Sequence, residues 1–176
     1  MRRMRNMTIR KETPNDHEQV RKILALAFGR ENEGRLVERL RKSPRFVPEL
    51  SLVAEIGDEI IGHILFFPIA VKSDGPQHSS LALAPVSVVP EYQGKGIGSQ
   101  LITEGLKRAK ELGYQSVIVL GHPEYYPRFG FKPASEWNIR APFEVPDEAF
   151  LAIELEEDGL RGVSGTVEYP DEFNDV

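Results

Sequence analysis

The sequence predicts an α+β fold: a single domain with a mixed, mostly antiparallel sheet, helices on both faces and a splayed parallel strand pair. Three observations favour this class. Two β-branched runs flank the tight turn Gly57-Asp58, as in a β-hairpin. A strand–helix–strand unit at 81–120 requires parallel strands, because its helix crosses back over the sheet. Pro85 lies inside the first of these strands and has no N–H for a ladder, so the pair should separate there.

Hydrophobic periodicity and turn residues set the order of the elements. Helical spacing of apolar residues recurs in three stretches, the longest of which begins at Ile97 and ends at the cap Gly113. In chain order we expect a strand at 8–11, a helix from Pro14-Asn-Asp16 to Gly29, a shorter helix before Pro44, a hairpin at 50–67, a connection at 72–77, a strand at 81–89, the helix from Ile97, a strand at 117–120, helical turns at 123–129, an antiparallel strand near 149–155 and an extended segment at 163–169.

Length and composition favour one domain with a substantial core. The chain has 176 residues, of which 40% are hydrophobic and 28% charged, as in an ordinary globular protein. No apolar run approaches the roughly 18 residues of a membrane helix, and none near the start resembles a secretory signal. Cysteine is absent, which excludes disulfides, thiolate metal sites and a cysteine nucleophile. These features lead us to expect a cytoplasmic protein without a membrane partner.

Charge is unevenly distributed along the chain. Residues 1–7 carry three arginines and are predicted to be a disordered leader, followed by a domain at 8–158 and an acidic C-terminal extension at 159–176. The net charge of −5 argues against nucleic-acid binding. The acidic end is most simply a solvated surface, and attraction of a cationic amine is the alternative.

The strongest functional signal lies at 86–99. An apolar strand leads into the glycine-spaced turn Gln93-Gly-Lys-Gly-Ile-Gly98, and a helix follows. Backbone N–H groups and the positive end of the helix dipole make such a turn a phosphate site. The spacing is neither the Rossmann fingerprint nor a P-loop, which disfavours a nucleotide-binding domain. Close packing of the helix on the strand would also explain the glycines.

The strand before the turn adds a second element to this signal. If pairing fails at Pro85, free backbone groups line a slot in which an amide-bearing ligand can bind like an added strand. A phosphate cradle joined to an amide-pairing slot has the shape of coenzyme A, with its pyrophosphate and pantetheine.

Two motifs resemble those of a known superfamily. Gln93-Gly-Lys-Gly96-Ile-Gly98 resembles the Gln/Arg-x-x-Gly-x-Gly/Ala signature of the GNAT superfamily of acetyl-CoA-dependent N-acetyltransferases. Tyr126, four residues before Gly130-Phe131, resembles the superfamily's second mark. The resemblance covers about residues 8–131, and 121–131 is most similar to the YhbS-like branch.

The resemblance implies an N-acetyltransferase domain with assigned site residues. Amides of 94–99 would bind the pyrophosphate, the strand at 86–88 would pair with pantetheine, and an N–H of that strand would face the thioester oxygen. Tyr126 aligns with the tyrosine that protonates the leaving thiolate, although a core tyrosine would look the same. The implied cofactor-binding residues are Val86, Ser87, Val88, Gln93, Gly94, Lys95, Gly96, Ile97, Gly98 and Ser99.

A general base is harder to identify. An alkylammonium must lose a proton before it attacks a thioester, and many relatives place a glutamate on the central strand. The strand at 81–87 has no carboxylate, which leaves His63 and His122 as candidates, each also explicable as structural. No metal is expected, because the four histidines lack ligand-like spacing.

The predicted function is direct transfer of acetyl from acetyl-CoA to a primary amine on a small molecule or peptide, without a covalent intermediate. The alternative is a non-catalytic acyl-CoA-binding module, which would need no base. Acceptor walls are expected at 28–45, 67–79 and 133–149, and the sequence leaves monomer and homodimer open.

Overall fold

The computed structural model describes residues 6–174 and has the predicted mixed α+β architecture. Within these residues there are three α-helices: α1 (His17–Phe28), α2 (Asn32–Lys42) and α3 (Ile97–Glu111). The strands are β1 (Met7–Lys11), β2 (Ser51–Ile56), β3 (Glu59–Lys72), β4 (His78–Val88), β5 (Ser116–Leu120), β6 (Lys132–Pro133), β7 (Ile139–Arg140), β8 (Phe150–Glu154) and β9 (Gly165–Glu168).

The strands form one sheet in the order β1-β2-β3-β4-β5-β8-β6, with β9 on β3 and β7 on β9. Antiparallel pairs join β1 to β2, β2 to β3, β3 to β9, β5 to β8 and β6 to β8. The pair β4–β5 is parallel, as predicted, and the short pair β7–β9 is a second parallel one. The predicted fold class is therefore confirmed.

The chain divides into two compact units, which are described separately. The first unit comprises residues 1–67, 84–108 and 172–176, and the second comprises 68–83 and 109–171. Strands β3 and β4 contribute residues to both units. No helix within residues 6–174 combines the length and the apolar character that crossing a membrane requires.

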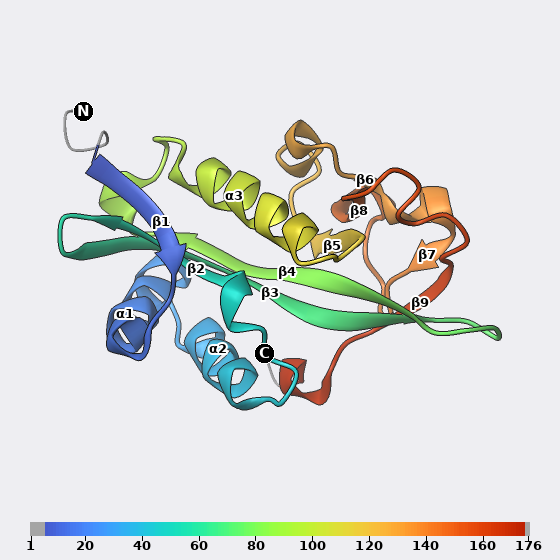
Figure 1. The fold of residues 1–176 in the computed structure, drawn as a ribbon, viewed down its shortest axis with the longest axis horizontal. Helices are drawn as coiled ribbons and strands as arrows, with labels where there is room; N and C mark the ends of the chain where they lie inside the picture. The colour runs from blue at the N-terminus through green and yellow to red at the C-terminus, as the bar shows by residue number, and fades with distance from the viewer. Residues whose placement is uncertain (1–5, 175–176) are drawn as a thin grey trace. The chain divides into compact units, whose positions relative to one another are not determined.

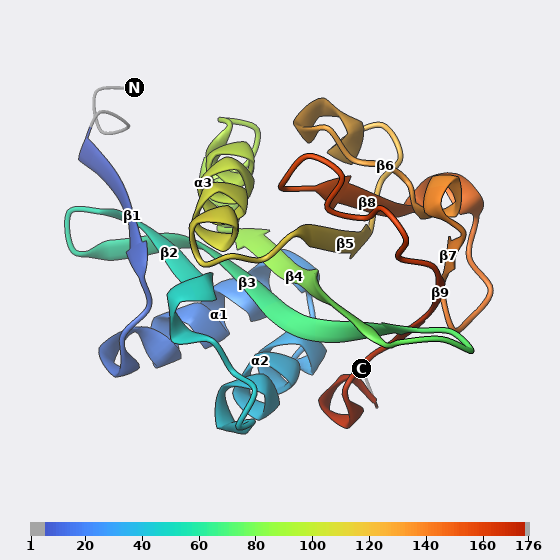
Figure 2. The same cartoon turned by 45° about the vertical axis from the view of Figure 1, so that its right-hand side comes forward.

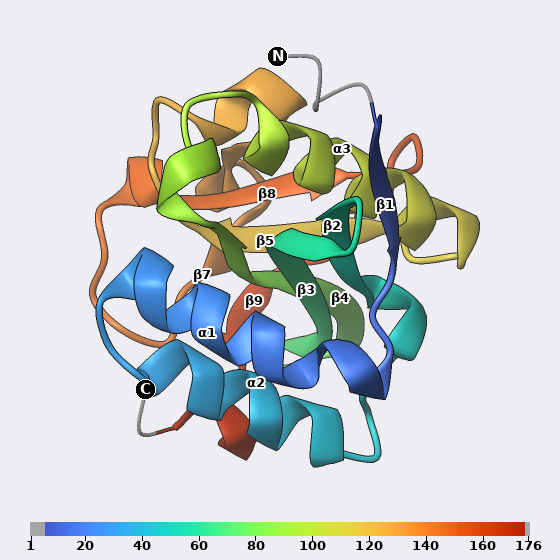
Figure 3. The ribbon, with the colours of Figure 1, turned by 90° about the vertical axis from the view of Figure 1, so that its left-hand side faces the viewer.

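In the first unit, helices cover both faces of the sheet. Helices α1 and α2 lie side by side on one face, and α3 lies on the other (Figures 1 and 3). Two glycines allow α3 to approach β3 closely. A Cβ on Gly62 would lie 3.0 Å from Leu101, and one on Gly105 would lie 2.2 Å from the ring of Phe66. Any side chain at Gly105 would therefore push α3 away from the strand.

In the second unit, β5 lies beside β8 (Figure 2). Their antiparallel register runs from Ser116–Glu154 to Leu120–Phe150. The parallel pairing of β5 with β4 is much shorter. Across the described residues it consists of Ala82 with Ile118 alone. Pro85 thus lies beyond the paired position of β4 and β5, where the two strands are predicted to separate.

Element boundaries differ from the predicted ones mainly where long-range pairing decides them. Strand β3 continues to Lys72, so 72–78 is the turn of a long hairpin rather than a loose connection. The short strands β6 and β7 were not predicted. Strand β1 begins at Met7, and residues 1–5 of the predicted leader lie outside the described residues. In the predicted extension, β9 joins the sheet, Leu160 is buried, and the domain boundary at 158 stays a prediction.

Candidate functional site

The glycine turn before α3 is built by backbone conformation. Gly94 and Gly96 have φ angles of +76° and +84°, in the left-handed region that L side chains rarely adopt. Both are exposed, and a Cβ at either position would meet no atom within 4 Å. Glycine is therefore required by the turn itself rather than by packing, and the space beyond the turn is open to a ligand.

The first turn of α3 lies next to this space. The first hydrogen bond of the helix runs from the N–H of Gln100 to the carbonyl of Gly96, at 3.1 Å. The N–H groups of Ile97 and Gly98 precede it and have no acceptor within the helix, because the first residues of a helix lack a preceding turn. The positive end of the helix dipole lies here, and the exposed Lys95 adds a full positive charge. This arrangement suits a phosphate or pyrophosphate.

Gln93 holds the turn to the end of β4. Its side-chain Nε2 donates to the carbonyl of Val88 at 2.9 Å, and its N–H donates to the carbonyl of Pro90 at 3.3 Å. The amide group of Gln93 is thus used inside the protein. This geometry gives Gln93 a positioning role for the turn, and the cofactor contact predicted for its side chain stays a prediction.

The end of β4 exposes one edge of its backbone. The N–H of Val89 donates to the carbonyl of Ile61 at 2.9 Å, which directs residue 89 toward β3. Because backbone groups alternate along a strand, Val86 and Val88 direct theirs to the opposite edge, where the carbonyl of Val88 already accepts from Gln93. Ser87 lies between them with its side chain buried, 4% exposed. By the same alternation its backbone faces β3, so the cofactor contact predicted for Ser87 stays a prediction.

Tyr126 begins a short 3₁₀ turn, Tyr126–Phe129, in the second unit. Its ring packs edge-on against Tyr125 and Phe131, and it fills the space that a side chain at Gly121 would occupy. Burial raises the pKa of Tyr126 to about 12, with the charge of Tyr125 adding to the effect. The phenol is therefore fully protonated at neutral pH and able to donate a hydrogen bond.

This pKa changes the expected role of Tyr126. An ordinary phenol, with a pKa near 10, would be well matched to a thiolate with a pKa near 8.5. With the pKa near 12, complete proton transfer to such a thiolate costs about 5 kcal/mol. Donation of a hydrogen bond to the developing thiolate is the cheaper contribution.

The two histidines considered as general bases, His63 and His122, differ in burial. His63 on β3 is fully buried, and its Nε2 lies 3.0 Å from Ser51 Oγ, which donates to Glu12 at 2.9 Å. Burial lowers the pKa of His63 to about 4, although the carboxylate of Glu12 opposes the change. Arg41 pairs with the same carboxylate. His63 is therefore neutral at pH 7, a weak base, and out of reach of an acceptor.

The network also fixes the tautomer of His63. Burial raises the pKa of Glu12, but the hydrogen bond from Arg41 and nearby charges lower it overall, so the carboxylate is ionised. Ser51 must then donate to Glu12 and accept from the Nε2–H of His63. His122, by contrast, has an exposed side chain, and its carbonyl accepts the N–H of Tyr125 and Tyr126. Of the two histidines, only His122 is open to a substrate.

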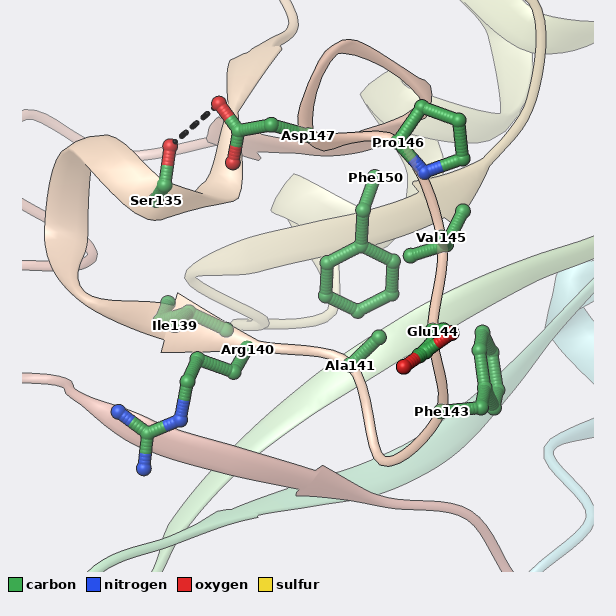
Figure 4. A pocket seen from close by; sticks show the side chains of 10 residues that line it. All are labelled: Ser135, Ile139, Arg140, Ala141, Phe143, Glu144, Val145, Pro146, Asp147 and Phe150. Atoms are coloured by element: carbon green, nitrogen blue, oxygen red, sulfur yellow. Dashed lines mark hydrogen bonds between the residues drawn. The ribbon is translucent and has the colours of Figure 1, made fainter.

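A pocket of about 660 Å³ lies in the second unit. Its lining overlaps the segment 133–149, which was predicted to form a wall of the acceptor site. Apolar side chains surround the ring of Phe150, with charged residues among the lining (Figure 4). No sequence motif indicates this pocket, because its lining comes from loop residues and the ends of short strands. Within residues 6–174, no group of three or more His, Asp or Glu side chains is placed to hold a metal ion.

The chain is similar to known proteins over most of its length. Residues 8–134 match the family model described as an acetyltransferase (GNAT) domain. The uncharacterized N-acetyltransferase YhbS of Escherichia coli (strain K12) is 36% identical over 169 residues, 96% of this chain and 99% of YhbS. The uncharacterized N-acetyltransferase YjhQ of the same strain is 39% identical over 135 residues, 76% of this chain and 75% of YjhQ.

Two solved structures agree with this relationship. The crystal structure of E. coli YhbS in complex with CoA matches with a TM-score of 0.88 at 35% identity, covering 96% of this chain and 92% of that one. A GNAT family acetyltransferase from Brucella melitensis in complex with acetyl-CoA matches with a TM-score of 0.78 at 34% identity, covering 96% and 98%. The resemblance predicted from the two motifs is confirmed.

Proposed function

Because this chain belongs to the GNAT family of acetyltransferases, we propose that it transfers acetyl from acetyl-CoA directly to a primary amine on a small molecule or peptide. The observation that carries the proposal is the open glycine turn at the start of α3, where left-handed Gly94 and Gly96 lead into the positive end of the helix dipole. Relatives that share the fold over nearly the whole chain were crystallised with CoA or acetyl-CoA.

The donor would bind through backbone groups. The amides of 94–99 would hold the pyrophosphate, with Lys95 adding charge, while Val86 and Val88 would pair with the pantetheine amides. Gln93 would act indirectly by holding the turn against β4. Such a site relies on donors that are already oriented, so little ordering is needed when the ligand binds.

Catalysis would consist of positioning and charge stabilisation. The amine nitrogen attacks the thioester carbon, a strand N–H stabilises the oxyanion, and the C–S bond breaks to release the coenzyme thiolate. Tyr126 would donate a hydrogen bond to that sulfur. The proton lost by the amine would pass to the exposed His122 or to water, since His63 is enclosed.

The alternative, a non-catalytic acyl-CoA-binding module, has one observation in its favour. The strand at 81–87 offers no carboxylate, and the nearest buried histidine on β3 is a weak base. Release of free thiol from acetyl-CoA, measured against a panel of amines, amino acids and peptides, separates the two. Thiol release that depends on an amine, with acetylated product seen by mass spectrometry, supports the enzyme. Tight binding of acetyl-CoA without turnover supports the module.

A further inference from the structure

The pocket at 135–150 has an apolar floor. Phe150 and Ile139 are buried, at 4% and 1% exposed, and Ala141 and Val145 lie around the ring of Phe150 (Figure 4). Phe143 lines the same pocket, is 47% exposed, and stacks on Tyr169 with ring centroids 6.2 Å apart. A floor of aliphatic and aromatic side chains binds an apolar ligand body by removing its surface from water.

The charged groups of the pocket are mostly acidic. Among the described residues, no hydrogen bond or ion pair is found for Glu144, so its carboxylate is available to a ligand. Asp147 accepts a hydrogen bond from Ser135 at 2.9 Å, which fixes a second carboxylate at the edge. The side chain of Arg140 extends away from Phe150, and its guanidinium donates to Thr166 Oγ1 at 3.4 Å (Figure 4). The pocket therefore favours a cation.

The pocket is linked to Tyr126 through the end of β5. Phe150 pairs with Leu120 in the β5–β8 register, and the N–H of Gly121 donates to the carbonyl of Ala149 at 2.9 Å. The ring of Tyr126 lies directly against Gly121. Paired residues share a face of the sheet, and Leu120 is 49% exposed, so it extends the apolar surface beside Phe150 toward Gly121.

From these three observations we propose that the pocket binds the acceptor and selects an apolar primary amine over amines that carry a carboxylate. Glu144 attracts the amine as its ammonium, which then loses a proton before it attacks the thioester. The proposal rests on the acetyl transfer proposed above. The apolar lining would bind the body of the acceptor, and the unpaired carboxylate of Glu144 would bind its positive charge. The contact between the pocket and the end of β5 would place the acceptor near Tyr126.

Three amines that differ by one feature each test this selectivity: phenethylamine, phenylalanine, which adds a carboxylate, and ethylamine, which lacks the aromatic body. At saturating acetyl-CoA, kcat/KM is expected to be at least tenfold higher for phenethylamine than for either of the others. Glu144→Gln should raise KM for phenethylamine about two- to fivefold, as expected for loss of one exposed charge contact. The KM for acetyl-CoA should not change.

Glu148→Gln is the matched control. Glu148 is an exposed acid four residues further along the same loop that does not line the pocket, so its loss changes net charge equally. Equal effects of the two substitutions would overturn a specific role for Glu144. Preference for phenylalanine, abolished by Arg140→Gln, would overturn the proposed amine class and indicate that Arg140 recognises a carboxylate.

A binding measurement separates failure of this inference from failure of the proposed function. Phenethylamine is titrated into the CoA-loaded protein and followed by calorimetry and by NMR of the pocket residues. Saturable binding that Glu144→Gln weakens and Glu148→Gln does not would support the pocket even if no amine is acetylated. Turnover of apolar amines without any perturbation at 135–150 would support acetyl transfer and overturn the pocket as its acceptor site.

Discussion

Two polar centres of the first unit differ in how their hydrogen-bonding groups are used. At the glycine turn, the backbone is held left-handed at Gly94 and Gly96, and the space beyond both residues is open. At the network of Glu12, Ser51 and His63, the polar groups are enclosed and bind each other, except for Nδ1 of His63, which has no partner among the described residues. The comparison indicates that the turn is built for a ligand and the network for stability. Substitutions at the two centres should therefore affect different measurements.

The largest expected effect is on coenzyme binding. Gly96→Glu places a negative side chain in the pyrophosphate space and strains the left-handed backbone, so affinity for CoA should fall by more than a hundredfold, measured by calorimetry. Gly113→Glu is the control, because Gly113 also has a positive φ, +94°, with nothing within 4 Å of its Cβ position. The control should lose only the roughly 1–2 kcal/mol of stability that strain costs. Equal loss of affinity in both variants would mean that strain, not the cradle, is responsible.

The second prediction concerns stability against pH. The pKa of His63 is about 4 in the fold and near 6.5 when unfolded, so the unfolded chain binds the extra proton first as pH falls. Stability is full above pH 6.5 and is lost as pH falls toward 4, by up to about 3 kcal/mol. The lowered pKa of Glu12 adds a loss below pH 4.5.

Urea unfolding at pH 7.5 and 4.5 measures this change. His63→Gln removes the titrating group and keeps an amide near the position of Nε2. In this variant the free energy of unfolding should change less between pH 7.5 and 4.5 than in the wild type. His78→Gln, at the start of β4, is the control and should leave the slope unchanged. If the free energy of unfolding of His63→Gln depends on pH as in the wild type, groups other than His63 cause the acid sensitivity. Affinity for CoA at pH 7.5 should be the same in all three proteins.

The third prediction tests Tyr126 as a hydrogen-bond donor in turnover. Tyr126→Phe should lower kcat about tenfold to thirtyfold while CoA affinity stays within twofold, and Tyr125→Phe should change kcat much less. Because burial raises the pKa of Tyr126 to about 12, its ionisation should not reduce kcat below about pH 11. Loss of activity near pH 10 that disappears in Tyr126→Phe would show a phenol with an ordinary pKa.

The smallest expected effect distinguishes positioning from contact at the turn. Gln93→Ala removes the hydrogen bond to the carbonyl of Val88 and should weaken CoA binding about two- to fivefold. Gln100→Ala, an exposed change one turn into α3, should have no effect. A loss above a hundredfold in Gln93→Ala would mean that the side chain contacts the coenzyme directly.

What the sequence determined by itself was local. Gly29, Gly57 and Gly113 mark the ends of helices and a hairpin turn because each adopts a positive φ, a requirement set by neighbouring residues. The turn at 93–98 was visible for the same reason, since a site made of backbone groups needs glycine at fixed spacing. The order of strand, turn and helix and the resemblance of two motifs then sufficed for the fold class and the family.

The tertiary structure decided everything that depends on burial and on residues distant in sequence. His63 became a structural residue because Ser51 and Glu12 enclose it. The contacts of His63 with Ser51 and of Ser51 with Glu12 span 12 and 39 positions and leave no local pattern. The buried side chain of Ser87 and the raised pKa of Tyr126 have the same origin. The pocket around Phe150 is built from side chains, which any loop can supply. Backbone geometry is encoded locally, whereas the environment of a side chain exists only once the chain has folded.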